Sequence, residues 1–349
     1  MILELASSAA IATIVSLVVC RVQMRAGPLD LPDEARKAHT RPTPTSGGIG
    51  IALGYAAGLT ALLQIFPAAE VLTRQDMALT SLASAIAFAF LLIGFIDDTR
   101  PIDPRIKFLF FTLLSFGAAI TMGIVSVVEV GVDQTLRLGL TIGLFGTALW
   151  VFTLVNCTNF MDGANGLAMG SISVGLIALG AIAYAAGSNS AMAMACFAAA
   201  AVIGFLVWNF PHGRIFAGDA GALFAGAIAA LASLILISRA DLSPFIPPIL
   251  FLPLLADALM TLAWRVRHRR KLLVGHQEHL YQILMRAGWS HARVSLLYWA
   301  LMAACGVIGY ALSRSGDAAA PWITLAALAG LAVTASIFVR KYARTHGLS

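Results

Sequence analysis

Charged residues are scarce in this chain of 349 residues. Asp, Glu, Lys and Arg make up 11% of it, against roughly 25% in ordinary soluble domains. Hydrophobic residues make up 59%, and the mean hydropathy is +0.87. Only helices and closed barrels satisfy their backbone hydrogen bonds in lipid. Because the apolar runs are long and do not alternate with polar residues, the sequence predicts an all-α polytopic membrane protein.

Cysteine is also scarce. The four cysteines lie within or at the ends of apolar runs: Cys20, Cys157, Cys196 and Cys305. They show no CxxC spacing, which argues against a disulfide framework or a zinc site. The first apolar segment lacks a basic leading region and a small-residue cleavage site, so we expect no cleavable signal peptide. The net charge of +6 does not indicate a nucleic-acid partner, because the basic residues lie beside membrane spans.

The long apolar runs define the predicted architecture. A membrane-spanning helix needs about 20 apolar residues, and eleven segments meet this requirement. Pro247–Pro248 should kink the ninth. In chain order the segments are Leu5–Val22, Gly48–Phe66, Met77–Ile96, Ile106–Gly123, Leu138–Val155, Leu167–Gly187, Ala191–Phe210, Ala220–Ser238, Pro244–Trp264, Val294–Leu312 and Trp322–Val339.

Basic residues predict the orientation in the membrane. An odd number of spans places the termini on opposite sides. One set of loops carries only Arg74, Arg137, Arg239 and Arg314, and the other set carries the remaining basic residues. Because cytoplasmic loops are enriched in Lys and Arg, we expect the N-terminus outside and the C-terminus in the cytoplasm. The unusual polar motifs then all lie on the cytoplasmic side.

The most unusual motif, at 156–167, directly follows the apolar segment Leu138–Val155. Asn156, Asn159 and Asp162 are spaced three apart, which places them on one face of a helix. Gly163 and Gly166 allow the helix to end and the backbone to approach a ligand. A polar loop at the membrane surface is the alternative, although such a loop rarely needs several amides together with a carboxylate.

Two further cytoplasmic loops carry charges suited to phosphate and metal. Lys37, His39 and Arg41 precede a Pro-rich and Gly-rich segment and suit a phosphate group, or anionic lipid headgroups as the alternative. The adjacent carboxylates of Asp97 and Asp98 end a span, which is costly unless they are paired or bind metal. Magnesium prefers such oxygen ligands. A structural pairing with Arg105 or Lys107 stays open, and Asp103 is a candidate helix cap.

The two remaining loops carry a lone carboxylate and a histidine motif. Asp219 stands between Gly218 and Gly221 and suits magnesium, or a helix cap as the alternative. Phe216 suits stacking on a planar base, or a place at the membrane interface.

The fifth loop follows Asp257, a carboxylate within a span and therefore a functional candidate. Its His276-Gln-Glu278-His279 run lacks HExxH spacing, so we favour phosphate over zinc. The basic cluster beside it also serves as a topology signal.

Together these motifs resemble those of the polyprenyl-phosphate N-acetylhexosamine-1-phosphate transferases. That family includes bacterial enzymes that start O-antigen and wall-teichoic-acid synthesis, and the muramoyl-pentapeptide transferase of peptidoglycan synthesis. The resemblance covers residues 37–282. It rests on the ordered motifs Lys37-x-His39-x-Arg41-Pro42-x-Pro44, Asp97-Asp98 with Lys107, Asn156-x-x-Asn159-x-x-Asp162-Gly163-x-Asn165-Gly166-Leu167, Phe216-x-Gly218-Asp219-x-Gly221 and His279.

The resemblance implies a role for each matching position. Asp97, Asp98 and Asp162 match the catalytic carboxylates. Asn159 and Asp219 match positions that hold magnesium, with manganese as an alternative. Substrate contacts are implied for Lys37, Arg41, Lys107, Asn156, Asn165, Phe216 and His279.

Within that set, Asn165 and Phe216 match the positions that bind uracil. Some members carry Asp at the position of Asn165. The fifth loop lacks three consecutive histidines, which is more similar to the branch that starts surface polysaccharides such as lipopolysaccharide O-antigen.

The implied reaction transfers an N-acetylhexosamine 1-phosphate from a UDP-sugar to undecaprenyl phosphate and releases UMP. It implies one domain, residues 1–349, in the bacterial inner membrane, with active-site loops 23–47, 97–105, 156–166, 211–219 and 265–293 facing the cytoplasm. The partners are polyprenyl phosphate, a UDP-sugar and membrane lipid, without nucleic acid, and a homodimer stays open.

Other protein classes fit the sequence less well. A transporter of lipid-linked or small anionic substrates should carry polar groups at mid-span depth, where only Asp257 lies. A structural scaffold has no need of Asp97 and Asp98 beside Asn159 and Asp162. A CDP-alcohol phosphotransferase would need a DGxxAR run, which is absent. The muramoyl-pentapeptide reaction remains an alternative, and the sequence does not name the sugar.

Overall fold

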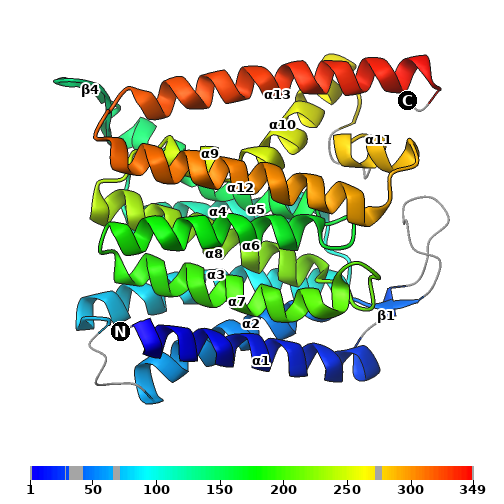
Figure 1. Ribbon diagram of the computed structural model, residues 1–349, viewed down its shortest axis with the longest axis horizontal. Helices are drawn as coiled ribbons and strands as arrows, with labels where there is room; N and C mark the ends of the chain where they lie inside the picture. The colour runs from blue at the N-terminus through cyan, green and yellow to red at the C-terminus, as the bar shows by residue number, and fades with distance from the viewer. Residues whose placement is uncertain (1, 28, 31–41, 66–70, 272–276, 348–349) are drawn as a thin grey trace.

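The computed structural model describes residues 2–27, 29–30, 42–65, 71–271 and 277–347. Long helices lie side by side along one axis (Figure 1). The elements are α1 (Ile2–Ala26), β1 (Leu29–Asp30), β2 (Thr43–Pro44), α2 (Gly47–Thr60), the π-helical turn η1 (Ala61–Ile65), α3 (Arg74–Thr99), α4 (Pro104–Met122), β3 (Val127–Gly131), β4 (Gln134–Arg137), α5 (Gly139–Phe160), α6 (Leu167–Ala185), α7 (Asn189–Asn209), α8 (Gly218–Ala240), α9 (Ile246–Leu250), α10 (Leu252–Arg267), α11 (Leu280–Arg286), α12 (His291–Ser315) and α13 (Ala320–Thr345). The strands form two antiparallel pairs, β1–β2 and β3–β4.

The predicted all-α, multi-pass membrane architecture is confirmed. In the described parts of the chain, ten helices are long and apolar enough to cross a membrane. Each of them corresponds to one predicted span. The ninth predicted span is instead divided between α9 and α10, so the count of eleven crossings stays a prediction.

The division of the ninth span differs from the predicted kink at Pro247–Pro248. Both prolines stand in the first turn of α9, where the missing N–H has no intrahelical acceptor to lose. The break lies at Phe251, between α9 and α10. Pro253 explains it, because its ring would clash with the carbonyl of Ile249 in a continuous helix.

The two ends of the bundle differ. One end carries the β3–β4 hairpin and the start of α1, and the other carries β1, α11 and the end of α13 (Figure 1). The chain therefore begins and finishes its helices at opposite ends of the bundle, as an odd number of passes requires. Which end faces the cytoplasm stays a prediction.

Helix α8 forms the centre of the bundle. Every residue from Ala220 to Leu236 is buried, as expected for a helix that is apolar on all sides. Glycines let its first turn approach other helices closely. A Cβ on Gly94 of α3 would lie 2.6 Å from the backbone nitrogen of Ala220, and one on Gly48 of α2 would collide with the backbone of Gly221. The starts of α2 and α8 and the end of α3 therefore meet at one place.

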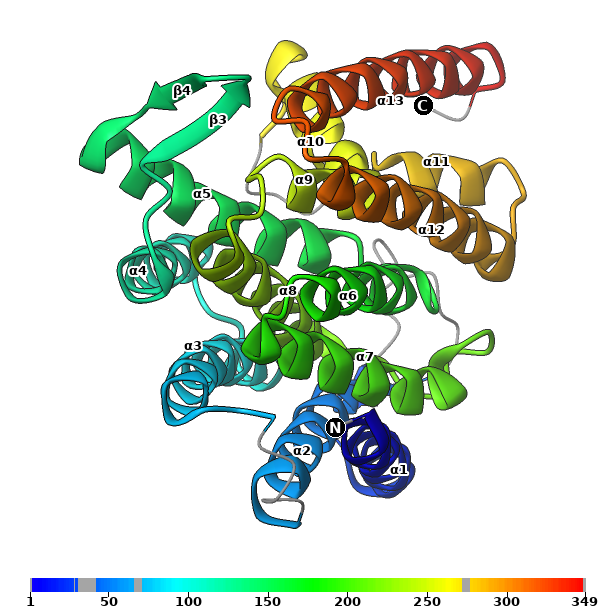
Figure 2. The same ribbon diagram turned by 60° about the vertical axis from the view of Figure 1, so that its left-hand side comes forward.

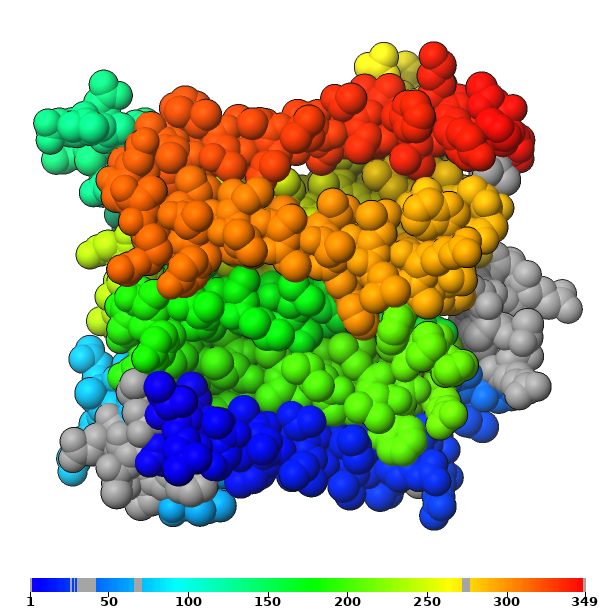
Figure 3. Space-filling view, in the orientation of Figure 1, coloured from blue at the N-terminus to red at the C-terminus, as the bar shows by residue number. Residues whose placement is uncertain are grey.

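The outer helices expose apolar side chains in the way expected of lipid contact. On α13, Ile337 is 64% exposed and Phe338 is 71% exposed. In Figure 2, α13 lies apart from the group formed by α1 to α8, and it packs against α9, α10, α11 and α12. The space-filling view shows α13, α12, α6, α7 and α1 as successive bands across one face (Figure 3).

Candidate active site

A cavity of about 1110 Å³ opens at the end of the bundle that carries β1 and α11. Six of the predicted site residues line it: Asp98, Asn159, Asp162, Asn165, Phe216 and Asp219. They come from α3, from the end of α5 and the turn after it, and from the start of α8 and the loop before it. The structure therefore brings together three loops that are far apart in the sequence.

Asp98 is tied to the first turn of α8. Its Oδ1 accepts a hydrogen bond from the backbone N–H of Asp219 at 2.9 Å, and its Oδ2 accepts one from Ala220 at 3.1 Å. The first N–H groups of a helix have no intrahelical acceptor, and a negative charge there is stabilised by the helix dipole. Asp98 thus caps α8 from another helix and fixes where Asp219 stands.

Gly218 makes this arrangement possible. It has a φ of +70°, and a Cβ there would lie 2.5 Å from both Asp98 Oδ2 and the carbonyl oxygen of Thr45. Glycine is the residue that tolerates both this backbone conformation and this proximity.

Asp97 has a different environment from its neighbour. Its Oδ2 lies 2.5 Å from Lys107 Nζ, and its Oδ1 accepts a hydrogen bond from the Ile102 N–H at 2.7 Å. Lys107 Nζ also lies 3.7 Å from Asp219 Oδ2. Lys107 therefore bridges two carboxylates, and the structural pairing that the sequence left open is present. Asp97 faces Lys107 and is not among the residues that line the cavity.

Asn159 and Asp162 differ from the predicted single helical face. Asn159 lies on α5 and donates a hydrogen bond from Nδ2 to Asp219 Oδ1 at 2.9 Å. Helix α5 ends at Phe160, so Asp162 lies in the following turn, and the predicted shared face is wrong for this residue. Gly166, with a φ of +77°, precedes α6 and helps to reverse the chain.

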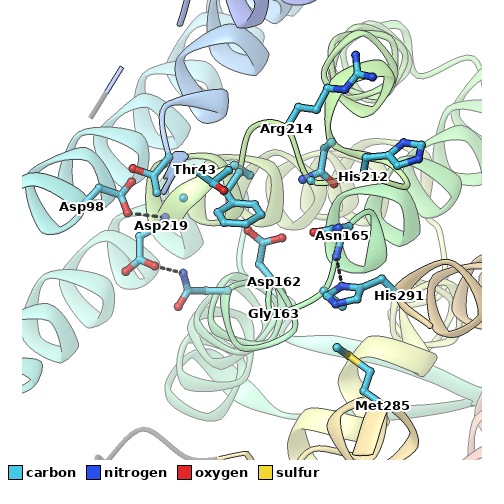
Figure 4. Close-up of a pocket in the computed structure, with 18 of the residues that line it drawn as sticks. Thr43, Asp98, Asp162, Gly163, Asn165, His212, Arg214, Asp219, Met285 and His291 are labelled. Carbon is cyan, nitrogen blue, oxygen red and sulfur yellow. Dashed lines mark hydrogen bonds between the residues drawn. The ribbon is translucent and has the colours of Figure 1, made fainter. Parts of the chain in front are cut away.

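Asp162 is placed where its ionisation is unfavourable. Burial and the negative charges of Asp219 and Asp98 raise the pKa of the Asp162 carboxyl from 3.8 to about 7. Figure 4 shows Asp98 and Asp219 close together, with Asp162 between them and Asn165. A cation bound here would relieve their mutual repulsion.

The carboxylate and amide side chains suit a metal ion that takes only part of its coordination shell from the protein. Within the described ranges, no three His, Cys, Asp or Glu side chains are arranged to enclose a metal ion. Magnesium usually takes one or two carboxylates and fills its other positions with water and substrate phosphates. The adjacent side chains of Asp219 and Asn159 suit such an open site.

The other side of the cavity is built around Asn165. The backbone N–H of Asn165 donates to His291 Nδ1 at 3.1 Å, and its Nδ2 donates to the Pro211 carbonyl at 3.0 Å. Figure 4 places His212, Arg214 and His291 around it. The backbone N–H of Phe216 donates to the Pro44 carbonyl at 2.8 Å, which joins this loop to β2.

Sequence reasoning missed part of the lining. Arg214, Gln282, Arg286 and His291 also line the cavity. Arg214 lies in the predicted active-site loop 211–219, and the other three residues lie in the predicted loop 265–293, but none of the four had an assigned role. Arg286 and His291 reach the cavity through the packing of α11 and α12.

The structure places several predicted contacts elsewhere. The Asn156 Nδ2 donates to the Phe152 carbonyl on its own helix at 2.7 Å. His279 is buried beside Asp257, and neither Asn156 nor His279 lines the cavity. Lys37 and Arg41, like His39 and His276, lie outside the described residues. The substrate roles of these residues stay predictions.

The capping role expected for Asp103 is confirmed: Asp103 caps α4, accepting a hydrogen bond from the Arg105 N–H at 2.8 Å. The four cysteines carry free thiols.

Known proteins resemble the chain over most of its length. The model of a family described as "Glycosyl transferase family 4" matches residues 79–237. A decaprenyl-phosphate N-acetylglucosaminephosphotransferase of Mycobacterium tuberculosis (strain CDC 1551 / Oshkosh) is 31% identical over 339 residues, which cover 88% of this chain and 82% of that protein. The chain belongs to glycosyl transferase family 4.

Other relatives of this family 4 transferase agree with the assignment. A probable undecaprenyl-phosphate N-acetylglucosaminyl 1-phosphate transferase of Bacillus subtilis is 28% identical over 295 residues, which cover 81% of this chain and 76% of that protein. A phospho-N-acetylmuramoyl-pentapeptide-transferase of Moorella thermoacetica is 26% identical over 272 residues, which cover 74% and 80%. The resemblance drawn from the loop motifs is confirmed, and this family 4 transferase is a multi-pass membrane enzyme.

Proposed function

We propose that this family 4 transferase moves an N-acetylhexosamine 1-phosphate from a UDP-sugar to a polyprenyl phosphate. One observation carries the proposal: a single cavity joins the carboxylates of Asp98, Asp162 and Asp219 to Asn165 and Phe216. One part of the cavity suits a diphosphate with a cation, and the other suits a planar base. The names of the relatives in B. subtilis and M. tuberculosis describe the same kind of transfer, to undecaprenyl or decaprenyl phosphate.

The proposed reaction exchanges one phosphoanhydride bond for another. An oxygen of the lipid phosphate forms a bond to the β-phosphorus of the UDP-sugar. The bond from that phosphorus to the bridging oxygen breaks, and UMP leaves with the bridging oxygen and its electron pair. Both reactants are anions, so the protein acts mainly by positioning them and offsetting their charge.

The described residues divide this work. Phe216 stacks on the uracil and Asn165 hydrogen-bonds its edge. Lys107, held between Asp97 and Asp219, supplies positive charge next to the diphosphate. Asp162, with a pKa of about 7, is suited to accept a proton from the lipid phosphate near neutral pH. Asp98 acts by holding the first turn of α8, and therefore Asp219, in place.

Magnesium is the cofactor that we propose, with manganese as an alternative of similar chemistry. Asp219 and Asn159 would hold it. When bound, the ion supplies positive charge to the diphosphate and clamps its oxygens. In the structure the amide nitrogen of Asn159 faces Asp219 Oδ1, so the amide would turn over to present its oxygen to the ion beside the carboxylate.

The proposed setting is the cytoplasmic face of the bacterial inner membrane, where the polyprenyl chain of the acceptor lies in lipid. The basic loops predict this face. We propose UDP-N-acetylglucosamine as the first donor to test, because N-acetylglucosamine is the sugar in the names of the B. subtilis and M. tuberculosis relatives. Membrane lipid surrounds the outer helices.

UMP release from purified protein tests the proposal. The assay contains undecaprenyl phosphate, Mg²⁺ and, in separate reactions, several UDP-N-acetylhexosamines and UDP-N-acetylmuramoyl-pentapeptide. We expect release with an N-acetylhexosamine donor that requires both lipid and metal. UMP release from the muramoyl-pentapeptide donor alone would reassign the reaction to the peptidoglycan type. Binding of UDP-sugars without lipid-dependent UMP release from any donor would contradict the proposed function.

A further inference from the structure

Asp257, on α10, is a buried carboxylate that the proposed chemistry does not use. Its side chain is 2% exposed. The Tyr298 hydroxyl donates a hydrogen bond to its Oδ2 at 2.6 Å, and the Thr261 hydroxyl donates to its Oδ1 at 3.3 Å. Burying a carboxylate is costly without such donors.

Asp257 fixes the start of α11. Its Oδ1 accepts a hydrogen bond from the Leu280 N–H at 2.7 Å, and its Oδ2 accepts one from the Tyr281 N–H at 3.0 Å. These are first-turn N–H groups, which have no intrahelical acceptor. Met285 and Arg286 of α11 line the cavity. The position at which α11 begins therefore determines where this part of the cavity wall lies.

Asp257 also faces the ring of His279. The Nδ1 of His279 lies 3.4 Å from Asp257 Oδ1, and the side chain is 4% exposed. A carboxylate beside one ring nitrogen sets the orientation of the ring. The ring centre lies 6.5 Å from that of Phe160, the sequence neighbour of Asn159. His279 is also the N-cap residue of α11, so Asp257 holds both the cap residue and the first turn of this helix.

The start of α11 also contacts the turn that carries Asp162. A Cβ on Gly163, the next residue, would collide with the Tyr281 hydroxyl. Tyr281 is itself held through its backbone by Asp257. One buried carboxylate thus connects the fifth loop, through His279, to the third loop, through Tyr281 and Gly163.

We propose that Asp257 is a positioning residue for the transfer reaction. It orients His279, the N-cap residue of α11, and holds the start of α11 against the turn at Asp162 and Gly163, so that the cavity wall formed by Met285 and Arg286 and the Asp162 carboxyl keep their places relative to each other. This inference rests on the proposed function. Asp257 does not line the cavity, and its effect on turnover runs through His279 and the start of α11.

A double-mutant cycle tests this connection. We compare Asp257→Asn, His279→Gln and the double variant, using UMP release to obtain kcat and KM for both substrates. Asp257→Asn should lower kcat/KM by about 10- to 100-fold, the usual effect of losing an orienting partner. In the His279→Gln background the same change should cost less than about threefold, because residues that act through one another are not additive.

Tyr298→Phe is the matched control. It removes a hydrogen bond to the same carboxylate but leaves His279 and the start of α11 in contact with it. We expect a lower melting temperature, with kcat/KM changed less than about threefold in either background. Full multiplication of the Asp257→Asn and His279→Gln effects, or wild-type turnover by Asp257→Asn, would overturn the proposal.

Hydrogen exchange gives a readout that does not depend on turnover. In Asp257→Asn, an amide nitrogen replaces one acceptor oxygen, so the backbone amides of Leu280 and Tyr281 should exchange at least about tenfold faster. Tyr298→Phe should leave them unchanged. If the wild-type chain releases no UMP, the proposed function fails, and the exchange still decides this inference: unchanged protection in Asp257→Asn contradicts it.

Discussion

At the scale of single residues, two carboxylates near helix N-termini have opposite expected importance. Asp219→Asn keeps the size of the side chain but removes the charge that faces Lys107 and Asn159. We expect kcat to fall by about 10²- to 10³-fold, as when one preorganised electrostatic group is lost, with membrane insertion unchanged. UMP release and detergent elution profiles measure both.

Asp103→Asn is the control for that change. Asp103 only caps α4, and Asn is an equally good cap, so turnover should be unchanged. Wild-type turnover by Asp219→Asn would remove this residue from the proposed mechanism.

The raised pKa of Asp162 predicts a stability that depends on pH. The folded-state pKa of about 7 lies above the ordinary value of 3.8, so the folded chain binds the proton more tightly than the unfolded chain does. Stability therefore falls as the pH rises through this range. Asp162→Asn cannot ionise, so it should melt roughly 2–4 °C higher than wild type at pH 8.

The comparison at low pH completes this test. The difference in melting temperature should be smaller at pH 5 than at pH 8, and it should vanish only below about pH 3.8, where the carboxyl is protonated in both the folded and the unfolded chain. Thermal unfolding in detergent without added metal measures the difference. A variant that melts below wild type at pH 8 would contradict the repulsion among Asp162, Asp98 and Asp219.

Individual site residues were predictable where local spacing carried the signal. Asp98, Asn159 and Asp219 stand out as polar residues at the ends of apolar runs, and each lines the cavity. Arg286 and His291 do not stand out, because tertiary packing alone brings them to the site. Spacing in the sequence did not show that the Asp98 carboxylate accepts hydrogen bonds from backbone N–H groups, because the donor residue Asp219 is 121 residues away.

At the scale of elements, the start of α8 depends on Gly218. Gly218→Ala adds a Cβ 2.5 Å from Asp98 Oδ2 at a positive φ, so the cap must move and Asp219 must move with it. We expect a loss of about 1–3 kcal/mol in stability and at least a tenfold loss of turnover. Thermal unfolding and UMP release measure these effects.

Gly117→Ala is the matched control on α4. A Cβ there would meet nothing within 4 Å, so the change should be neutral or stabilising by about 0.5–1 kcal/mol. Equal turnover of Gly218→Ala and Gly117→Ala would show that the contact with Asp98 is dispensable.

Element boundaries were less predictable than element positions. Hydropathy located the spans but ended the fifth at Val155, whereas α5 continues to Phe160. The polar residues Asn156 and Asn159 therefore lie within the helix, and the Asn156 amide donates to the Phe152 carbonyl one turn back. Likewise, the break at Phe251 depends on Pro253, which hydropathy alone does not distinguish from the prolines before it.

At the scale of the whole molecule, the orientation in the membrane is the main open prediction. Asp133, in the β3–β4 hairpin, and His268, at the end of α10, are exposed near opposite ends of the bundle (Figure 1). In a cysteine-free background, Asp133→Cys should react with a membrane-impermeant maleimide on intact spheroplasts. His268→Cys should react only after lysis, because positive loops stay inside. The reverse pattern would invert the proposed topology.

Helix α13 follows all the other helices in the chain, yet its side chains hold the fifth loop, which is synthesised earlier. Arg340 donates hydrogen bonds to the Glu278 carbonyl at 3.1 Å and to Thr261 at 2.8 Å, and it stacks over Trp264 at 4.8 Å. During synthesis, all residues that line the cavity precede Arg340 in the chain. A nascent protein can therefore assemble its catalytic pocket before this fastening exists. A premature stop codon between positions 291 and 340 would leave every residue that lines the cavity in the chain but would remove the contacts of Arg340 with the fifth loop, so such alleles should behave as loss of function.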